Sequence, residues 1–517
     1  MSRLSLTLKN GWIALVFQLA YVVVQFFARN IFLENLGDEF LGVEGTLRSM
    51  LMFLNLSELG IGAAVGFSLY KPIFENDREK INEIIGYLGY LYKKIGLFVL
   101  ISGCTLILFF PLLFKETDTS LSIIIYLFFS LIVGNLINYF FTYHMFLLEA
   151  DQKSYVNVKI YQTIHISKLI VQCLVLLYFK SITLWVTLEL LAPFIGVFIL
   201  RKKIKKIYPW LIFNFKTNQE VKERNKPLLK KIKQISFHKL GSFVTTGTDN
   251  IVIFALINPA AVAFVGNYQM VMGNINILVN KLFDGTNASV GNLVAENDIK
   301  NMLKVFWEMM ALRFYFAGTT LLLMYIGLDD FIILWLGEKY LLTNSVLAAL
   351  VIIFFIFQTR QPVDSFKQAY GLYDDIWSPV VQSIINLVFS IFFVIKYGIL
   401  GVFIGTIISQ FIVVMLWRPY YLFAKGFKVS TAVYWKGFIQ HLIYLSFASG
   451  LFYFIFHLFD TEMSSSIFIL IYKLTKLGIV FLLVYFMVLR LFSKGFKNLI
   501  NRFYPLIKKK LKKNHKH

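Results

Sequence analysis

About fourteen apolar stretches follow one another along this chain, each near the ~20 residues that a helix needs to cross the ~30 Å hydrocarbon core of a bilayer. A spanning segment must satisfy its own backbone hydrogen bonds, and the short alternating segments typical of membrane barrels do not dominate here. The 517 residues are 58% apolar and only 15% charged, which excludes an ordinary soluble multidomain protein. The sequence therefore predicts an all-α polytopic membrane protein.

Polar breaks between the apolar stretches give the predicted spans. They cover residues 11–33, 42–70, 87–114, 121–148, 155–179, 182–200, 238–257, 263–288, 305–328, 341–359, 379–396, 400–422, 435–458 and 467–490. The first stretch is too long for the apolar part of a signal peptide and lacks a small-residue cleavage pattern, so we expect it to remain as a helix.

The net charge of +22 is distributed unevenly between alternate connections. Most basic residues fall on the side of the two termini, whereas the opposite loops hold only Lys115, Lys180, Lys339 and Lys396. An excess of Lys and Arg marks the cytoplasmic side, so both termini are expected there. The basic residues thus serve to orient the chain in the membrane, and no nucleic-acid partner is expected.

A basic connection divides the chain into two halves of six spans. We expect an N-terminal lobe over 1–200, a cytoplasmic connection over 201–237, a C-terminal lobe over 238–422, two further helices over 423–491 and a basic tail over 492–517. Asn30-Ile31 resembles Asn250-Ile251, and Leu41-Gly42 resembles Val265-Gly266, which suggests two copies of one unit. Parallel repeats of this kind place a substrate site between the lobes.

Several predicted spans carry a charge near mid-span, where ionisable groups are costly and usually line a pathway. Arg29 and Arg48 lie on the first two spans, joined by the tight turn at Gly37. Both could snorkel to headgroups, or both could face one cavity and grip a phosphate through bidentate hydrogen bonds. The second interpretation makes them substrate-binding candidates.

The eighth span carries Lys281 and Asp284 one helical turn apart, so they can face each other. Lys281 is a third substrate-binding candidate. In the repeat, Asp249 takes the position of Arg29 and could confront it across a central cleft; the alternative is that it caps a helix break near Gly247. A carboxylate at such depth suits a coupling H⁺ or Na⁺, so Asp249 and Asp284 are the ion-coupling candidates.

The remaining mid-span charges have other interpretations. Contacts between neighbouring helices are expected for four charged or potentially charged residues, Glu189, Lys168, His165 and Arg313. Lys473 and Lys476 share one face of the last span, where they could snorkel outward or line a groove for an anionic lipid.

Enzyme signatures are absent from the sequence, and we expect a protein that is not an enzyme. Asp329-Asp330 and Asp374-Asp375 resemble the metal pairs of glycosyltransferases, but each is predicted in a connection too short for a catalytic domain. No nucleotide-binding loop of the Gly-rich Lys-Ser/Thr type occurs, so energy is expected from an ion gradient. Cys104 and Cys173 fall inside apolar spans, and no cofactor or metal is expected.

The stretch from Arg29 to Ile73 resembles the start of Wzx-type polysaccharide flippases of the multidrug/oligosaccharidyl-lipid/polysaccharide (MOP) exporter superfamily. The resemblance rests on the turn LGDEFLG at Leu36 to Gly42, the run LSELGIG at Leu56 to Gly62 and the exit SLYKP at Ser68 to Pro72, in that order and spacing. It covers about a tenth of the chain, and the remaining spans agree in number and hydropathy.

The resemblance implies two six-helix lobes plus two extra helices in a bacterial plasma membrane. It implies alternating access on undecaprenyl-pyrophosphate-linked oligosaccharide for capsule, O-antigen or another surface polymer, with polymerase or glycosyltransferases of that pathway and membrane lipids as partners. Arg29, Arg48 and Lys281 match cationic positions in the related lipid II flippase branch, and Lys473 and Lys476 match its lipid groove. The alternatives are a cation-coupled multidrug exporter of the same superfamily and a membrane polysaccharide polymerase or ligase.

Overall fold

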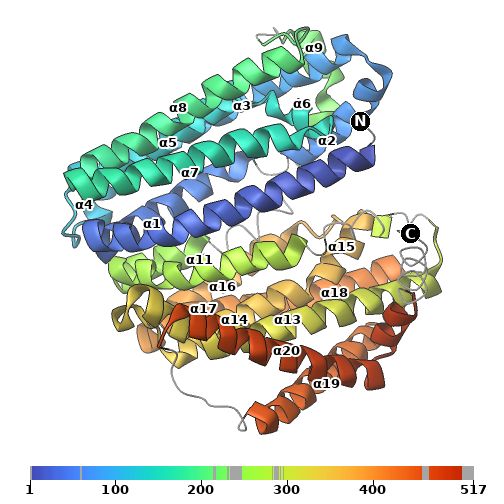
Figure 1. The fold of residues 1–517 in the computed structure, drawn as a ribbon. Coiled ribbons are helices and arrows are strands. Elements are labelled where there is room, and N and C mark those ends of the chain that lie inside the picture. The colour runs from blue at the N-terminus through green and yellow to red at the C-terminus, as the bar shows by residue number, and fades with distance from the viewer. Residues whose placement is uncertain are drawn as a thin grey trace, which may run out of the picture. The chain divides into compact units, whose positions relative to one another are not determined.

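The computed structural model describes residues 3–58, 61–213, 217–229, 232, 247–281, 283, 290–291, 293–294, 296–456 and 465–502. Within these ranges the chain is helical and has no strand, which confirms the all-α prediction. Twelve described helices are long and apolar enough to cross a membrane, and a shorter apolar helix covers Gly247–Leu256. The chain divides into two compact units, Met1–Gly266 (unit 1) and Asn267–His517 (unit 2) (Figure 1).

Unit 1 contains the helices from the N-terminus to the first part of α11. They are α1 (Arg3–Leu54), η1 (Asn55–Glu58), α2 (Ile61–Glu75), α3 (Arg78–Ile107), α4 (Phe110–Leu113), α5 (Leu121–Phe141), α6 (Met145–Ala150), α7 (Ser154–Phe179), α8 (Ile182–Ile207) and α9 (Gln219–Arg224). Helix α1 packs on α7, and α5 packs between α3 and α8 (Figure 1).

Unit 2 contains the rest of α11 (Pro259–Lys281) and the helices that follow. They are α13 (Ile299–Leu336), η2 (Glu338–Tyr340), α14 (Asn344–Thr359), α15 (Gln361–Ala369), α16 (Trp377–Tyr397), α17 (Ile399–Ser409), the π-helix η3 (Gln410–Trp417), α18 (Arg418–Tyr421), the π-helix η4 (Leu422–Phe427), α19 (Ala432–Phe456) and α20 (Ile467–Phe492). Helix α13 packs against α14 and α20, and α20 packs against α19.

The first two predicted spans meet at Gly37, inside α1. Its φ of 82° and ψ of 161° break the helical path. Residues with a side chain rarely adopt a positive φ, so glycine is required at this turn. Close packing explains a second glycine of the motif, because a Cβ on Gly42 would lie 1.7 Å from the carbonyl oxygen of Pro259. The LGDEFLG run thus encodes one turn and one close helix contact within unit 1.

Several predicted spans differ from the observed helices. The span at 121–148 divides into α5, which ends at Phe141, and α6, which begins at Met145. The span at 42–70 is interrupted, because α1 ends at Leu54 and α2 begins only at Ile61. The span at 305–328 is longer than predicted, since α13 continues to Leu336 and takes Asp329 and Asp330 into its last turns. At the last two places the polar side chains bind side chains of other helices: Asn55 and Glu58 in the first case, Asp329 and Asp330 in the second. Hydropathy does not predict such contacts.

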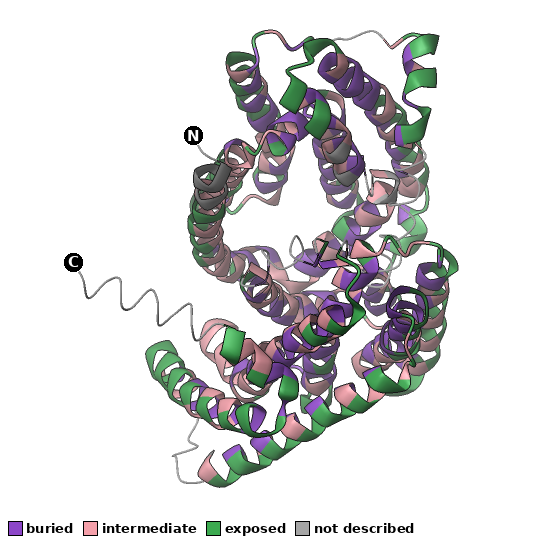
Figure 2. Ribbon diagram, turned by 90° about the vertical axis from the view of Figure 1, so that its right-hand side faces the viewer, coloured by how far each residue is buried: buried purple, intermediate pink, exposed green. Residues whose placement is uncertain are grey.

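Exposed residues are largely apolar on the peripheral helices. Ile395 and Phe468 are each 83% exposed, and Phe454 is 76% exposed. Figure 2 shows exposed residues along the outer sides of helices and buried residues where helices face each other. A surface of this kind suits contact with lipid hydrocarbon.

Candidate functional site

Unit 1 holds a cluster of charges deep in its helices, centred on Glu189 of α8. The Glu189 carboxylate accepts hydrogen bonds from Lys168 Nζ at 2.7 Å, from Arg48 Nη2 at 3.2 Å and from Gln172 Nε2 at 3.4 Å. Arg48 Nε also donates to Glu44 Oε1 at 2.7 Å, one helical turn before it. We call these five residues the Glu189 cluster.

Exposure separates the members of the Glu189 cluster. The side chains of Glu189 and Lys168 are 8% and 11% exposed, whereas that of Arg48 is 46% exposed. The two buried charges neutralise each other and tie α7 to α8. The pairing expected for Lys168 and Glu189 is thereby confirmed. Arg48 therefore has the most exposed side chain of these three charged residues.

Arg29 lies in α1 before the break at Gly37, whereas Arg48 lies after it, and the two arginines make different contacts. Arg29 Nη2 donates to the carbonyl oxygen of Ala263, at 3.1 Å, within unit 1. The half-buried side chain therefore reaches the first turns of α11. This hydrogen bond from Arg29 joins α1 to α11.

Asp249 is buried in the short helix Gly247–Leu256, with 5% of its surface exposed. Its neighbour Asn250 donates from Nδ2 to Ser49 Oγ at 3.1 Å, which places this helix beside the segment of α1 that carries Arg48. An added Cβ on Gly247 would lie 2.7 Å from Met52, so the contact is close. Asp249, Arg29 and Arg48 thus belong to one compact unit.

In unit 2, Lys281 is the last residue of α11 and is half-buried. Oδ1 of the preceding residue, Asn280, accepts from Arg313 Nη1 at 2.9 Å, and the same nitrogen donates to Gln358 Oε1 at 2.6 Å. The guanidinium also lies 3.7 Å from the ring centroid of Phe283. The interhelical contact expected for Arg313 is confirmed, and it fixes the end of α11. Asp284 lies outside the described residues.

Lys473 has an acidic partner that the sequence did not suggest. Its Nζ lies 3.3 Å from Asp330 Oδ2 of α13, and both side chains are largely buried. The preceding Asp329 accepts from Tyr268 Oη at 2.6 Å. The two aspartates therefore join α13 to α20 and to α11, which is a structural use of a pair that resembled a metal site. Lys476 lies one turn further along α20.

A polar cavity of about 200 Å³ lies where the predicted second span is interrupted. Asn55 Oδ1 accepts from Tyr139 Oη at 2.8 Å and from Asn135 Nδ2 at 3.3 Å, and Glu58 accepts from Tyr92 Oη at 2.9 Å. Glu58, Asn135 and Tyr139 line the cavity. Sequence reasoning used Glu58 only as part of a motif and missed its role. The signal was available, because two polar residues interrupt an apolar run.

Sequence reasoning also missed a buried charged network in unit 2. Asp364 lies 3.0 Å from Arg418 Nη1 and 3.4 Å from Arg360 Nε, and Asp375 accepts from Lys367 Nζ at 2.5 Å and from Trp417 Nε1 at 3.0 Å. All but Arg418 and Trp417 fall between the predicted spans, where Asp375 was considered only as half of a possible metal pair. In the structure they join α15 to the π-helical region that ends at Phe427.

No family model matches this sequence, and no curated protein matches it. Solved structures do match its fold. The lipid II flippase MurJ in an inward closed conformation matches with a TM-score of 0.67 and 17% identity over 94% of this chain and 100% of that one. An inward-facing multidrug resistance MATE family transporter of the MOP superfamily matches with a TM-score of 0.62 and 14% identity over 81% and 99%.

A third structure is a MOP superfamily transporter from Pyrococcus furiosus, described as having a binding pocket of reverse polarity. It matches with a TM-score of 0.52 and 13% identity over 82% of this chain and 97% of that one. These identities are low, and the matches concern the fold. This chain has the fold of the MOP superfamily transporters.

Proposed function

We propose that this protein is a flippase for undecaprenyl-pyrophosphate-linked oligosaccharide repeat units in a bacterial plasma membrane. Its product would supply capsule, O-antigen or another surface polysaccharide. One observation carries the proposal: Arg48 lies on a helix long and apolar enough to span a membrane, with its side chain 46% exposed and its guanidinium held by Glu44 and Glu189. A charge at such depth is costly and is kept where it serves a polar substrate.

The chemistry of Arg48 suits a diphosphate. A guanidinium donates paired hydrogen bonds in a planar fork that matches phosphate oxygens. Arg48 donates from Nε to Glu44 and from Nη2 to Glu189. An arriving diphosphate would therefore compete with these two carboxylates for the same N–H groups. Such competition allows release as well as binding, which a transporter requires. Arg29 and Lys281 are proposed as further cations for the same headgroup.

Ion coupling is proposed to use carboxylates that are not committed to the Glu189 cluster. Asp249 is buried beside the segment of α1 that carries Arg48, and Asp284 is the second candidate. A carboxylate that alternates between a cationic side chain and H⁺ or Na⁺ can bias an alternating-access equilibrium. Lys473 and Lys476 are proposed to face an isoprenoid lipid, although Lys473 would do so as a neutral pair with Asp330.

The proposal is tested by complementing a strain that lacks its own repeat-unit flippase. We expect Arg48→Ala and Lys281→Ala to abolish surface polysaccharide at an unchanged protein level in the membrane, and Lys281→Arg to retain much of the activity. Lys159→Ala is the matched control, because it removes one exposed cation from α7 of unit 1. Polymer at the wild-type level in both the Arg48 and Lys281 variants would remove these residues from the substrate path.

A further inference from the structure

Unit 2 contains a second basic feature, a cavity of about 570 Å³ where α13 and α19 begin and α20 ends. Lys300 and Lys304 line it from the first turns of α13, Lys436 from the first turns of α19, and Lys494 from just beyond α20. None of these lysines belongs to the predicted substrate, ion or lipid-groove residues. We call them the four cavity lysines.

One acid near this cavity, Glu308, interacts more strongly with Arg502 than with Lys304. Among the described residues no carboxylate lines the cavity, and none forms an ion pair with any of the four cavity lysines. Glu308, one turn beyond Lys304, is buried and paired with Arg502 at 3.0 Å. Helix α19 also directs its positive end toward this region, whereas the N-terminus of α13 is capped by the Asp298 carboxylate. An anion is therefore the complementary occupant.

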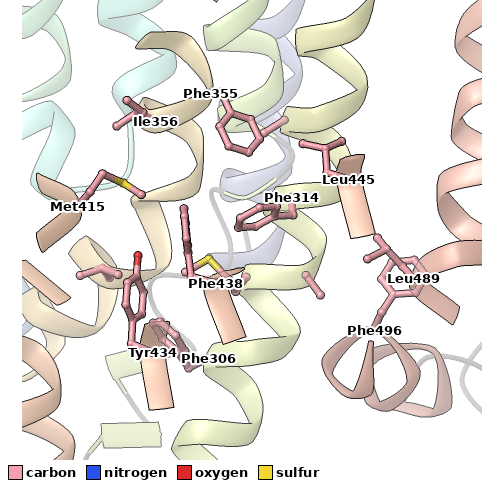
Figure 3. Close-up of a cluster of buried hydrophobic side chains, with 14 of the residues drawn as sticks. Phe306, Phe314, Phe355, Ile356, Met415, Tyr434, Phe438, Leu445, Leu489 and Phe496 are labelled. Carbon is pink, nitrogen blue, oxygen red and sulfur yellow. The ribbon is translucent and has the colours of Figure 1, made fainter. Parts of the chain in front are cut away.

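Two stacked aromatic side chains, Trp307 and His441, line the cavity, and we call them its aromatic floor. The rings of Trp307 and His441 are parallel to within 6° at a centroid distance of 5.8 Å. His441 Nδ1 lies 2.7 Å from the Gly437 carbonyl oxygen, which only accepts, and Nε2 lies 3.2 Å from Ser493 Oγ. Figure 3 shows the buried cluster of unit 2, in which the rings of Phe314 and Phe438 lie 5.2 Å apart.

The edge of the cavity continues into an apolar surface. Phe492, which lines the cavity, is 53% exposed, and its neighbour Leu491 is 65% exposed. On α19, Ile443 and Phe447 are exposed on either side of Tyr444, another lining residue. A free phosphate ion has no apolar part that could contact such a surface. A lipid whose headgroup enters the cavity would lay its acyl chains along it.

We propose that this cavity binds the phosphate headgroup of an anionic glycerophospholipid resident in the membrane. The four cavity lysines hold the phosphate, the aromatic floor carries the glycerol portion, and the acyl chains follow the exposed faces of α19 and α20. Basic pockets between membrane helices bind lipid headgroups by this chemistry. The inference goes beyond the proposed function, because it concerns a bound lipid and not the transported one.

The test is a titration of the purified full chain in neutral detergent with phosphatidylglycerol, with retained lipid counted by native mass spectrometry. Lys304→Ala combined with Lys436→Ala should weaken binding about 30-fold, since each basic residue near an anionic headgroup accounts for about fivefold. Lys425→Ala combined with Lys497→Ala removes two exposed cations of the same unit from outside the cavity and should leave binding near the wild-type value.

Three outcomes would overturn the proposal. They are equal weakening by the two double variants, retention of phosphatidylcholine as tight as that of phosphatidylglycerol, and retention of a polyprenyl diphosphate without phosphatidylglycerol. All the replaced lysines are exposed, so folding should persist. If the first variant fails to fold, Lys300→Ala combined with Lys494→Ala gives the same readout.

Discussion

The Glu189 cluster allows a prediction that separates an effect on stability, at Glu189, from an effect on transport, at Arg48. Replacing Glu189 by Gln keeps the size of the side chain but removes the negative charge that faces the Lys168 ammonium at 2.7 Å. Both side chains are about nine-tenths buried. Removing one partner of a buried pair leaves an uncompensated charge, which costs about 3–5 kcal/mol of unfolding free energy.

Arg48 should behave differently because its side chain is nearly half exposed. Exposed ion pairs contribute only about 0.2–1 kcal/mol. We therefore expect Arg48→Ala to cost at most about 1 kcal/mol of stability. Transport should nevertheless be lost in this variant, since the Arg48 guanidinium is the proposed phosphate donor.

A double variant separates charge pairing from general disruption. Lys168→Met combined with Glu189→Gln removes both members of the buried pair, so no uncompensated ammonium remains. Coupled neighbours differ from additivity by about 0.5–3 kcal/mol, and the double variant should recover an amount in that range relative to Glu189→Gln alone.

The assay is unfolding of the purified protein in mixed micelles by titration with SDS, followed by loss of helical circular dichroism. The expected order of destabilisation is Glu189→Gln, then the double variant, then Arg48→Ala. If Glu189→Gln is as stable as the wild type to within about 0.5 kcal/mol, the charge is hydrated and the reasoning from burial is wrong.

Three further predictions concern coupling, acidity and topology. Asp249→Asn should slow export and reduce its response to an imposed H⁺ or Na⁺ gradient while lipid-linked substrate still binds; a variant that responds fully would exclude the coupling role, and loss of protein from the membrane would support a structural one. Beyond the end of α5 at Phe141, burial and the nearby Arg201 lower the pKa of His144 to about 4. The unfolded chain takes up this proton near pH 6.5, so stability should fall by about 2 kcal/mol between pH 7 and pH 5, and His144→Phe should lose this part of the pH dependence in unfolding titrations. Reporter fusions after residues 80, 220 and 517 should report the cytoplasm, and fusions near 117 and 462 the outside; an external signal at 220 would contradict the predicted division of the chain.

Hydropathy predicted the helices because the bilayer imposes one length and one composition on every span. Each predicted span has a described helix at its position, although the ends moved where polar residues lie inside a helix. Asp329 and Asp330 show the reason. Their charges marked the end of a span in the sequence, but Tyr268 and Lys473 supply partners that let α13 continue past them.

The sequence predicted which charged residues form the candidate site, but not which of them pair with one another. Glu44 and Arg48 are four residues apart on one helix, so their contact could have been derived from the sequence. The contact between Arg48 and Glu189 joins residues 141 positions apart and depends on how α1 and α8 pack. Sequence spacing carries no information about such a pair. The accessibility of Arg48 likewise became apparent only from the packed helices.

The most direct test of the account is translocation by the purified protein in proteoliposomes. Undecaprenyl-pyrophosphate-linked oligosaccharide is placed in one leaflet, and its appearance in the other is measured with an impermeant sugar-modifying reagent, alongside uptake of a cationic drug. The account predicts translocation of the lipid-linked oligosaccharide by the wild type and by Lys159→Ala, its loss in Arg48→Ala, and no drug transport. Drug transport without movement of the lipid-linked oligosaccharide would contradict it.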